Sequence, residues 1–327
     1  MERLWLSEAR HLSRVEGEPP APEPDEVVIR VAACGVCGTD LHIVKGESRV
    51  HLPLVLGHEF GGTVSDVGRN VSGLASGDRA VVDPNIVCHA CPQCRAGRIN
   101  LCENLSAIGV DRDGGMSDYC LVPQRQTYLV PKGFPWQGLA LVEPLSCVLH
   151  GIDLARPRAG ERVALVGAGA IGLFFVQLLR GWAGDLAVSE PNPDRRSRAA
   201  RFGASPIEPA AEGRFDLVIE ASGTTGGFVD AIRFVRRGGR VLQFGVAPIG
   251  ATAAVSPNEI YSKELTIVGS YVNPFTLQRA IDLLATGAID YQAVDIRFFR
   301  LAEFEEAFEA AAAGRYGKVV FRMGGTV

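Results

Sequence analysis

The sequence predicts an α/β protein in which a doubly wound parallel sheet is joined to a β-rich part. Three observations support this prediction. Up to about residue 150, short β-branched runs are separated by glycines and polar turns. After residue 160, apolar strands alternate with helical stretches, which is typical of a parallel sheet covered by helices. The end of the chain changes again, to an amphipathic helix and one more strand that could return to the first part.

The expected elements follow one another in that order. In the first part, strands are predicted at residues 26–32, 62–67 and 79–82. In the second part, strands are predicted at residues 163–166, 186–189, 217–220, 241–244 and 266–268, with helices at 173–180 and 195–202. The last two elements are a helix at 301–312 and a strand at 318–322.

Length and composition describe an ordinary globular protein. The chain has 327 residues, 33 Lys and Arg against 37 Asp and Glu, and 47% hydrophobic residues. Two domains are favoured, because a single core stops growing at about 250–300 residues. Nothing in the charge balance indicates a nucleic acid partner. The first ten residues contain no long apolar run, so we expect no secretory signal, no membrane association and a cytoplasmic protein.

A glycine-rich loop stands between the expected strand at 163–166 and the helix after it. Its residues are Gly167, Ala168, Gly169, Ala170, Ile171 and Gly172. The first glycine permits a tight turn, the second lets the backbone approach a pyrophosphate, and the third lets helix and strand pack closely. We therefore predict a dinucleotide site with the pyrophosphate at the helix N-terminus. The loop also makes a membrane span over residues 163–179 a poor interpretation.

Glu190 directly follows the next expected strand, and its carboxylate indicates the kind of dinucleotide. A carboxylate there can accept hydrogen bonds from both adenosine ribose hydroxyls and would repel a 2′-phosphate. NAD is thus favoured, and NADP less so. Arg195 and Arg196 weaken this preference, because a nearby Arg can accommodate that phosphate. The alternative for both is a solvated position in the first turn of the next helix.

Four cysteines form a compact C-x2-C-x2-C-x7-C pattern: Cys88, Cys91, Cys94 and Cys102. Four thiolates supply a closed tetrahedral site without room for substrate, so we predict structural zinc. An iron–sulfur cluster is the alternative, but ferredoxin runs close with an x3 gap and then Pro. His89 lies inside the loop and is expected to be an exposed side chain outside the metal shell.

A second set of potential ligands is more widely spread and comprises Cys37, His58 and Glu143, with Glu59 beside His58. A lone Cys or His in a globular chain is more often a packing residue than a ligand. The surrounding motifs change that interpretation.

These motifs resemble the zinc-dependent medium-chain dehydrogenases, and more closely their polyol and threonine dehydrogenase branch. They are residues 35–42 (GVCGTDLH), 57–62 (GHEFGG), 114–119 (GGMSDY), 143–146 (EPLS), the four-cysteine loop and the glycine loop. The resemblance covers nearly the whole chain. It implies a GroES-like catalytic domain formed by residues 1–150 and 288–327, a Rossmann domain formed by 151–287, and an active site in the cleft between them.

The resemblance also implies roles for single residues. Cys37 and His58 match the catalytic zinc ligands, Glu143 falls where a third protein ligand stands, and Glu59 matches a carboxylate that sometimes exchanges with water as a ligand. One thiolate, one imidazole and one carboxylate with water leave an open position, as in a catalytic zinc site. Asp40 resembles the residue that orients the His58 imidazole. Two zinc ions per chain are therefore expected.

The implied reaction is reversible oxidation of a secondary alcohol to a ketone with hydride transfer to NAD. Thr39 and His42 resemble a relay that carries the proton to solvent, and His suits the terminal position because it titrates near neutral pH. The resemblance also implies that Lys318 pairs with Glu59, as a basic residue does in relatives; a solvated edge-strand Lys is the alternative.

Substrate and assembly are left open by the sequence. A polyol, an amino alcohol or a sugar fits, although residues 271–273 (YVN) lack the Arg found in many sorbitol dehydrogenases. The apolar edge segment at 265–270 suits a homodimer or homotetramer. The alternatives are an inactive zinc-containing binding or regulatory relative, an NADP-dependent carbonyl reductase, or a zinc-free reductase, and the complete ligand set disfavours the last.

Overall fold

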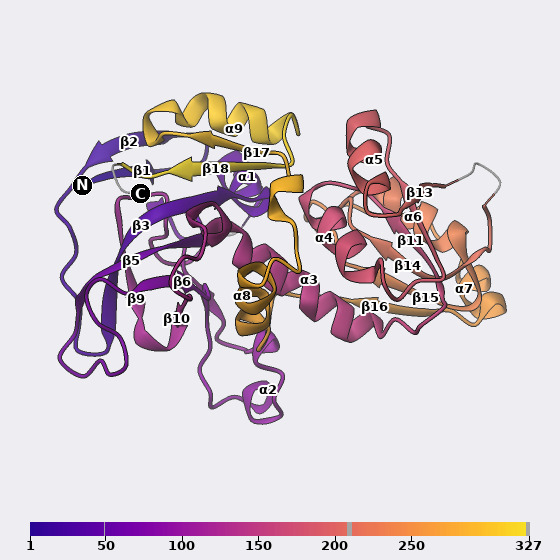
Figure 1. Ribbon diagram of the computed structural model, residues 1–327, viewed down its shortest axis with the longest axis horizontal. Helices are drawn as coiled ribbons and strands as arrows, with labels where there is room; N and C mark the ends of the chain where they lie inside the picture. Colours follow the sequence, from indigo (N-terminus) through magenta and orange to yellow (C-terminus); the bar gives the residue numbers. More distant parts are fainter. Residues whose placement is uncertain (49, 208–210, 325–327) are drawn as a thin grey trace. The chain divides into compact units, whose positions relative to one another are not determined.

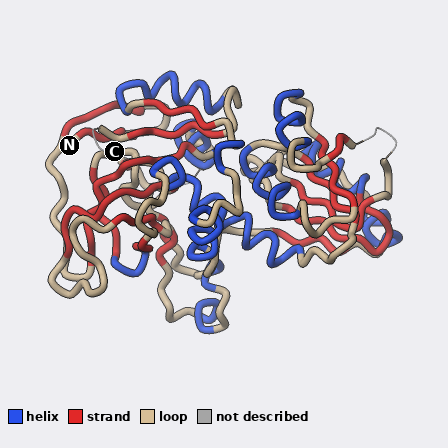
Figure 2. The backbone as a smooth tube through the Cα atoms, in the orientation of Figure 1, coloured by secondary structure: helices blue, strands red, loops and turns tan. Residues whose placement is uncertain are grey.

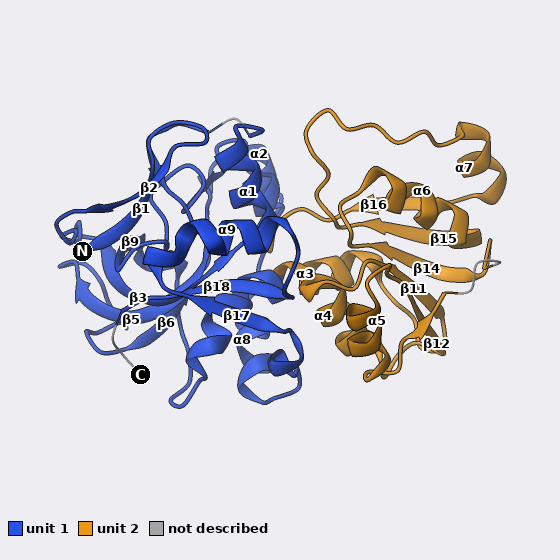
Figure 3. Ribbon diagram, turned by 90° about the horizontal axis from the view of Figure 1, so that it is seen from above, with its two compact units in different colours: residues 1–146, 274–327 blue, residues 147–273 orange. Residues whose placement is uncertain are grey.

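The structure is a computed structural model that describes residues 1–48, 50–207 and 211–324. The chain forms two compact units, of which the first comprises Met1–Ser146 and Pro274–Val327 and the second Cys147–Asn273 (Figure 3). Residues 274–287 thus belong to the first unit, whereas the sequence prediction placed them in the second domain. The hydroxyl of Thr276 donates to the backbone carbonyl of Ser146 at 2.7 Å, which ties this stretch to the first unit.

The first unit is built on a mixed sheet with the strand order β10-β6-β5-β3-β18-β17, and β9 also pairs with β3. These strands are β3 (Glu26–Val36), β5 (Glu59–Val67), β6 (Arg79–Val82), β9 (Tyr119–Pro123), β10 (Thr127–Leu129), β17 (Ile296–Phe299) and β18 (Lys318–Arg322). Smaller sheets are formed by β1 (Glu2–Leu6), β2 (Leu12–Glu16) and β4 (Leu54–Val55), and by β7 (Asn85–Ile86) and β8 (Ser106–Ala107).

The first unit also contains several short helices. They are α1 (Gly38–Lys45), α2 (Pro92–Arg95), α8 (Leu277–Ala285) and α9 (Phe304–Ala312), with 3-10 helices η1 (Ile99–Leu101), η2 (Gln124–Gln126), η3 (Trp136–Leu141), η4 (Tyr291–Ala293) and η5 (Leu301–Glu303). The amphipathic helix α9 lies along β18 (Figure 1), where the rings of Phe308 and Phe321 are 6.3 Å apart. The last strand therefore does return to the first part of the chain, next to β3.

The second unit is a six-stranded parallel sheet with the order β13-β12-β11-β14-β15-β16. Its strands are β11 (Arg162–Val166), β12 (Asp185–Ser189), β13 (Ser205–Pro206), β14 (Phe215–Glu220), β15 (Val235–Gln243) and β16 (Thr266–Gly269). Its helices are α4 (Ala170–Leu179), α5 (Pro193–Ala200), α6 (Thr225–Phe234) and α7 (Pro257–Lys263). The order reverses direction at β11, so right-handed crossovers put α4 and α5 on one face and α6 and α7 on the other (Figure 3).

One apolar helical stretch, Trp136–Ala155, combines η3 with α3 (Val142–Ala155). Within the described residues it is the one stretch long and apolar enough to cross a membrane, with a mean hydropathy of 1.4. However, 72% of that stretch is buried inside the protein, as in the core helix of a globular protein. The apolar run at 163–179 is strand β11, the glycine loop and the ten-residue helix α4, as predicted.

Candidate active site

Helix α1 and its N-cap carry four of the predicted site residues, and three of them lie at its start. Cys37 is its N-cap, and Asp40 in the first turn accepts the backbone N–H of Cys37 through Oδ2 at 2.8 Å. The N-terminus of a helix favours negative charge, so this position suits a metal-binding thiolate. Thr39 follows in the same turn, with its Oγ1 3.8 Å from the Sγ of Cys37.

Asp40 also faces His58, which precedes strand β5. Its Oδ1 lies 3.6 Å from the Nδ1 of His58, and the Asp40 side chain is fully buried. Burial by itself lowers the pKa of His58, but the charges of Asp40 and Cys37 outweigh burial and raise that pKa well above its ordinary value. With Nδ1 directed at Asp40, Nε2 is the nitrogen left for a metal, which is the orientation that a partner carboxylate gives to a ligand His.

Glu59 forms a buried ion pair with Lys318 of β18, whose Nζ lies 2.7 Å from Oε1. The side chains are 2% and 10% exposed. Burial lowers the pKa of Lys318, but the charge of Glu59, followed by those of Cys37 and Glu143, raises it above the usual range. Gly35 makes room for the pair, because a Cβ there would lie 2.2 Å from Oε2 of Glu59 and 3.0 Å from Cε of Lys318.

Cys37, His58 and Glu59 each offer a ligand atom, and these atoms all lie within 4.8 Å of one another. Two atoms bound to one zinc at 2.0–2.3 Å cannot be more than about 4.6 Å apart, so the set fits a single ion after a small adjustment. Glu143 lies outside this group of the described residues. It stands in the first turn of α3 and is 8% exposed. Its role as third ligand remains a prediction.

His42 lies in the last turn of α1, and its side chain is 25% exposed. Its Nδ1 is 2.6 Å from Oε2 of Glu47, which follows the C-cap Gly46. A carboxylate can only accept, so Nδ1 donates and Nε2 is left free to take up a proton. No motif in the sequence pointed to Glu47.

The four-cysteine loop is irregular apart from the short helices α2 and η1 (Figure 2). All four Sγ atoms lie within 4.8 Å of one another, and Sγ of Cys102 is 3.5 Å from that of Cys88 and 4.0 Å from that of Cys91. These distances exclude disulfides and match the sulfur–sulfur spacing of about 3.8 Å around one tetrahedral zinc. His89 is exposed, as predicted.

Backbone N–H groups in this loop donate to cysteine sulfurs and so stabilise the thiolate form. Those of Ala90 and Cys91 donate to Sγ of Cys88 at 3.4 and 3.3 Å and lower its pKa to about 6. Cys94 differs, since burial, followed by its contact with the Cys102 side chain, raises its pKa to about 12. An ion that binds all four sulfurs must therefore displace the proton of Cys94.

The glycine loop in the second unit leaves room for a ligand at one position only. Gly167 has φ +96, and a Cβ there would lie 3.0 Å from the backbone N of Ser222. A Cβ on Gly172 would lie 2.2 Å from the carbonyl oxygen of Gly167. A Cβ on Gly169 would meet nothing within 4 Å. Gly167 and Gly172 therefore shape the turn, and Gly169 leaves open space beside the N-terminus of α4, where a pyrophosphate would bind. Ala170 and Ile171 form the first turn of α4.

Glu190, at the end of β12, is 8% exposed and accepts the backbone N–H of Ala168 at 2.8 Å and of Asn192 at 2.9 Å. Each carboxylate oxygen keeps one lone pair for a ribose hydroxyl. Arg196 is half-buried, and its Nη1 donates to the carbonyls of Glu190 and Pro191 at 2.6 and 2.7 Å. Arg195 lies in the first turn of α5, with its backbone N–H on the Asn192 side chain.

Comparison with known proteins identifies this combination of sites. A family model described as alcohol dehydrogenase GroES-like domain matches residues 23–132, and one described as zinc-binding dehydrogenase matches residues 170–286. D-arabinitol dehydrogenase 1 of Uromyces fabae is 34% identical over 98% of this chain and 97% of its own length. The chain belongs to the zinc-dependent medium-chain dehydrogenase family.

Two further members of the zinc-dependent medium-chain dehydrogenases are similar over their whole length. L-threonine 3-dehydrogenase of Pyrococcus abyssi is 34% identical, with 94% of each chain covered. A zinc-binding dehydrogenase from Sinorhizobium meliloti, solved bound to NADP, is 39% identical with a TM-score of 0.93 and 98% of each chain covered. The predicted family and its fold, a GroES-like part with a Rossmann sheet, are confirmed.

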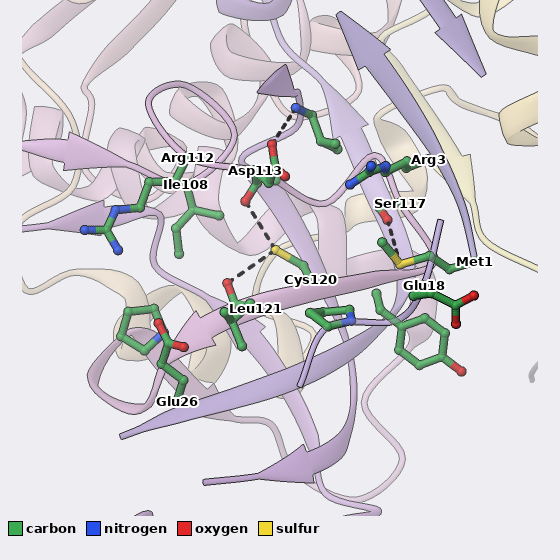
Figure 4. A pocket seen from close by; sticks show the side chains of 15 residues that line it. Met1, Arg3, Glu18, Glu26, Ile108, Arg112, Asp113, Ser117, Cys120 and Leu121 are labelled. Atoms are coloured by element: carbon green, nitrogen blue, oxygen red, sulfur yellow. Dashed lines mark hydrogen bonds between the residues drawn. The ribbon is translucent and has the colours of Figure 1, made fainter. Parts of the chain in front are cut away.

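A separate cavity of about 260 Å³ lies in the first unit of this dehydrogenase (Figure 4). Its lining includes Arg3, Arg112 and Cys120, and none of the predicted zinc ligands. Burial raises the pKa of the Cys120 thiol, whose Sγ contacts the carbonyls of Asp113 and Leu121. Cys120 is thus a packing residue rather than a reactive thiol.

Proposed function

We propose that this dehydrogenase reversibly oxidises a secondary alcohol to a ketone, with NAD as the hydride acceptor and with two zinc ions per chain. The observation that carries the proposal is the group of Cys37, His58 and Glu59 within 4.8 Å of one another at the N-terminus of α1. The thiolate and the imidazole, completed by one of the nearby carboxylates, supply three ligands and leave a position for substrate. We assign the zinc sites to the first unit and the dinucleotide site to the second.

The zinc-ligand set is proposed as Cys37 and His58 with one of two carboxylates. Both oxygens of Glu59 contact Lys318, so the Glu59 carboxylate is already engaged in an ion pair. Glu143 is then the third ligand, and Glu59 enters the shell only when it leaves Lys318. A zinc ion held by these residues would supply Lewis-acid chemistry that lowers the pKa of the substrate hydroxyl, and NAD would accept the hydride.

The residues of this chain have to remove the hydroxyl proton. We propose that Thr39 receives it beside Cys37 and that His42 delivers it to solvent, since His42 is partly exposed and its Nε2 is an acceptor. Asp40 keeps His58 in the tautomer that a metal requires.

The cofactor is proposed to be NAD rather than NADP. Support comes from the buried carboxylate of Glu190, which would repel a 2′-phosphate, and from Arg196, whose guanidinium is held by backbone carbonyls. The NADP-bound relative from Sinorhizobium meliloti makes NADP the competing candidate. A polyol, a sugar acid or an amino alcohol is proposed as substrate. D-arabinitol dehydrogenase 1 and L-threonine 3-dehydrogenase support the first and the last, and a 2-dehydro-3-deoxy-L-galactonate 5-dehydrogenase of Pseudoalteromonas atlantica, 32% identical over 90% of this chain, supports the sugar acid.

The test is metal analysis combined with NAD and NADP reduction across a panel of polyols, sugar acids and amino alcohols. We expect two zinc per chain and NADH formation with at least one alcohol. One zinc per chain and no turnover with any alcohol would instead favour the inactive binding or regulatory relative.

We also propose that the enzyme works in the cytoplasm as a homodimer or homotetramer. The thiolates required by the two clusters suit a reducing compartment. The edge strand β16 is largely exposed, and Ile267 on it and Tyr271 just after it are 37% and 55% exposed. An exposed apolar edge of this kind suits pairing with a second copy. Sedimentation of the purified protein tests the assembly.

A further inference from the structure

Strand β14 ends in a carboxylate, Glu220, that the reaction described above does not use. The residue is 0% exposed. It accepts hydrogen bonds from the backbone N–H groups of Ser222 at 2.8 Å and Gly223 at 3.0 Å, from the hydroxyl of Ser222, and from Nε2 of Gln243 at 2.8 Å. Burying a carboxylate is costly unless its lone pairs are satisfied, and here backbone, hydroxyl and amide donors from two loops satisfy them.

The donors stand at the carboxyl ends of two neighbouring strands. Ser222 and Gly223 follow β14, and Gln243 ends β15. The backbone carbonyl of Glu220 binds the second loop as well, because it accepts the N–H groups of Phe244 and Gly245 at 3.0 and 2.8 Å. Glu220 thus joins both loops at the carboxyl edge of the sheet.

Glycines surround this side chain closely. A Cβ on Gly227 would lie 2.7 Å from Oε1 of Glu220, and a Cβ on Gly245 would lie 2.6 Å from Oε2. The carboxylate therefore occupies space that a side chain at position 227 or 245 would fill. Its position is set by packing as well as by hydrogen bonds.

The loop that Glu220 holds touches the glycine loop. The N–H of Ala221 donates to the carbonyl of Val166 at 2.9 Å, and a Cβ on Gly167 would lie 3.0 Å from the backbone N of Ser222. The backbone that Glu220 fixes is thus the wall beside the first glycine of the dinucleotide site.

The order of the strands indicates which half of the cofactor would contact this backbone. Glu190 directly follows β12, on one side of β11, and Glu220 ends β14, on the other side. A dinucleotide crosses the sheet where the order reverses, which here is β11. With its adenosine ribose at Glu190, it reaches the ends of β14 and β15 with its nicotinamide half.

We propose that Glu220 is a positioning residue that shapes the surface for the nicotinamide half of the dinucleotide, by holding the Ser222–Gly223 backbone and the Gln243 amide in place. This inference rests on the proposed function. Glu220 touches no reacting atom and acts through the two loops.

The test uses Glu220→Gln, which keeps size and shape but turns an acceptor oxygen into a donor that faces the Gln243 amide. The probes are NADH, NADPH and AMP, each titrated against the purified full-length enzyme. We expect the Kd of NADH to rise at least tenfold and the Kd of AMP to change by less than twofold. The double variant Glu220→Gln/Gln243→Glu restores an acceptor opposite the new donor and should recover part of the NADH affinity.

The outcomes separate the explanations. If Glu220→Gln weakens AMP and NADH equally, the residue only stabilises the unit and the inference is wrong. Unchanged binding of NADH also overturns it. If the wild-type enzyme binds neither NADH nor NADPH, the proposed function and this inference both fall, whereas normal wild-type binding with an unaffected variant removes this inference alone.

Discussion

The Nδ1 atom of His42 lies 2.6 Å from Oε2 of Glu47, across the C-terminus of α1. The contact orients the imidazole, and the hydrogen bond from His42 lowers the pKa of Glu47. Because the pKa of Glu47 is lowered, its carboxylate stays ionised until the pH falls through the lowered value. Glu47 can therefore accept a hydrogen bond from Nδ1 at both pH 7 and pH 9.

The relay makes the first prediction. His42→Gln should slow turnover at least about tenfold at pH 7, since a positioned general base contributes on the order of 10²-fold or more, and slow it less at pH 9, where hydroxide replaces the base. Glu47→Gln retains an acceptor oxygen and should have a smaller effect in the same direction. Steady-state rates at both pH values measure this, and equal slowing by His42→Gln at pH 7 and 9 would reject the relay.

The glycine loop makes the second prediction. Gly169→Ala meets open space, so the melting temperature should stay unchanged while the Kd of NADH rises, because the new methyl group occupies the place of the pyrophosphate. Gly172→Ala meets the carbonyl of Gly167 and should cost about 1–3 kcal/mol of stability, as overpacking does. Gly181→Ala, also in open space but outside the loop, is the control. A normal NADH Kd for Gly169→Ala would contradict the proposed site.

The Glu59–Lys318 pair makes the third prediction. Lys318→Met leaves a buried carboxylate without its cation and should lower the free energy of unfolding by about 3–5 kcal/mol. The double variant Glu59→Gln/Lys318→Met should recover part of the loss. Because the pKa of Lys318 is raised, the contribution is complete below the ordinary Lys pKa and is lost only as the pH rises through the raised value. Urea unfolding should therefore give the same difference at pH 6 and pH 9.

The third zinc ligand makes the fourth prediction. If Glu143 completes the set with Cys37 and His58, Glu143→Gln should lose the catalytic zinc and keep the structural one, so that metal analysis gives one zinc per chain. Glu59→Gln should retain two. The reverse pattern would assign the ligand role to Glu59.

Proton release at the four-cysteine loop makes the fifth prediction. At pH 7 the Cys88 thiol, with a pKa of about 6, is already mostly ionised, and the Cys94 thiol, with a pKa of about 12, is not. Zinc added to chelator-treated protein should displace at least one proton per structural site, measured with a pH indicator in weak buffer. The variant Cys94→Ser should release fewer protons, and equal release would contradict the assignment.

The sequence predicted most of the second unit, because each of its elements is local. An apolar strand, a glycine turn and an apolar helix follow one another within residues 162–179, and each is encoded by neighbours in the chain. Helix α4 nevertheless begins at Ala170, three residues earlier than expected, because the loop glycine Gly172 lies within its first turn. Boundaries of this kind depend on packing rather than on periodicity.

The site was predictable where residue types stand close together in sequence, as in the four-cysteine loop. Contacts between distant segments were harder to foresee. Gly35 is needed because Glu59 and Lys318 meet above it, and Lys318 is 259 residues from Glu59. Glu220 gave no signal, since a carboxylate at a strand end is ordinarily solvated. Its burial follows from three glycines and two loops that only the folded sheet brings together.

The position of β18 next to β3 has a consequence for how the protein is made. The sheet of the first unit cannot be completed, nor Glu59 paired, until residues 318–322 have left the ribosome, whereas every residue of the second unit has been synthesised before them. During translation the second unit can fold first. Until β18 has been added, Cys37 and His58 belong to an incomplete sheet. We therefore expect the catalytic zinc to bind late in biosynthesis.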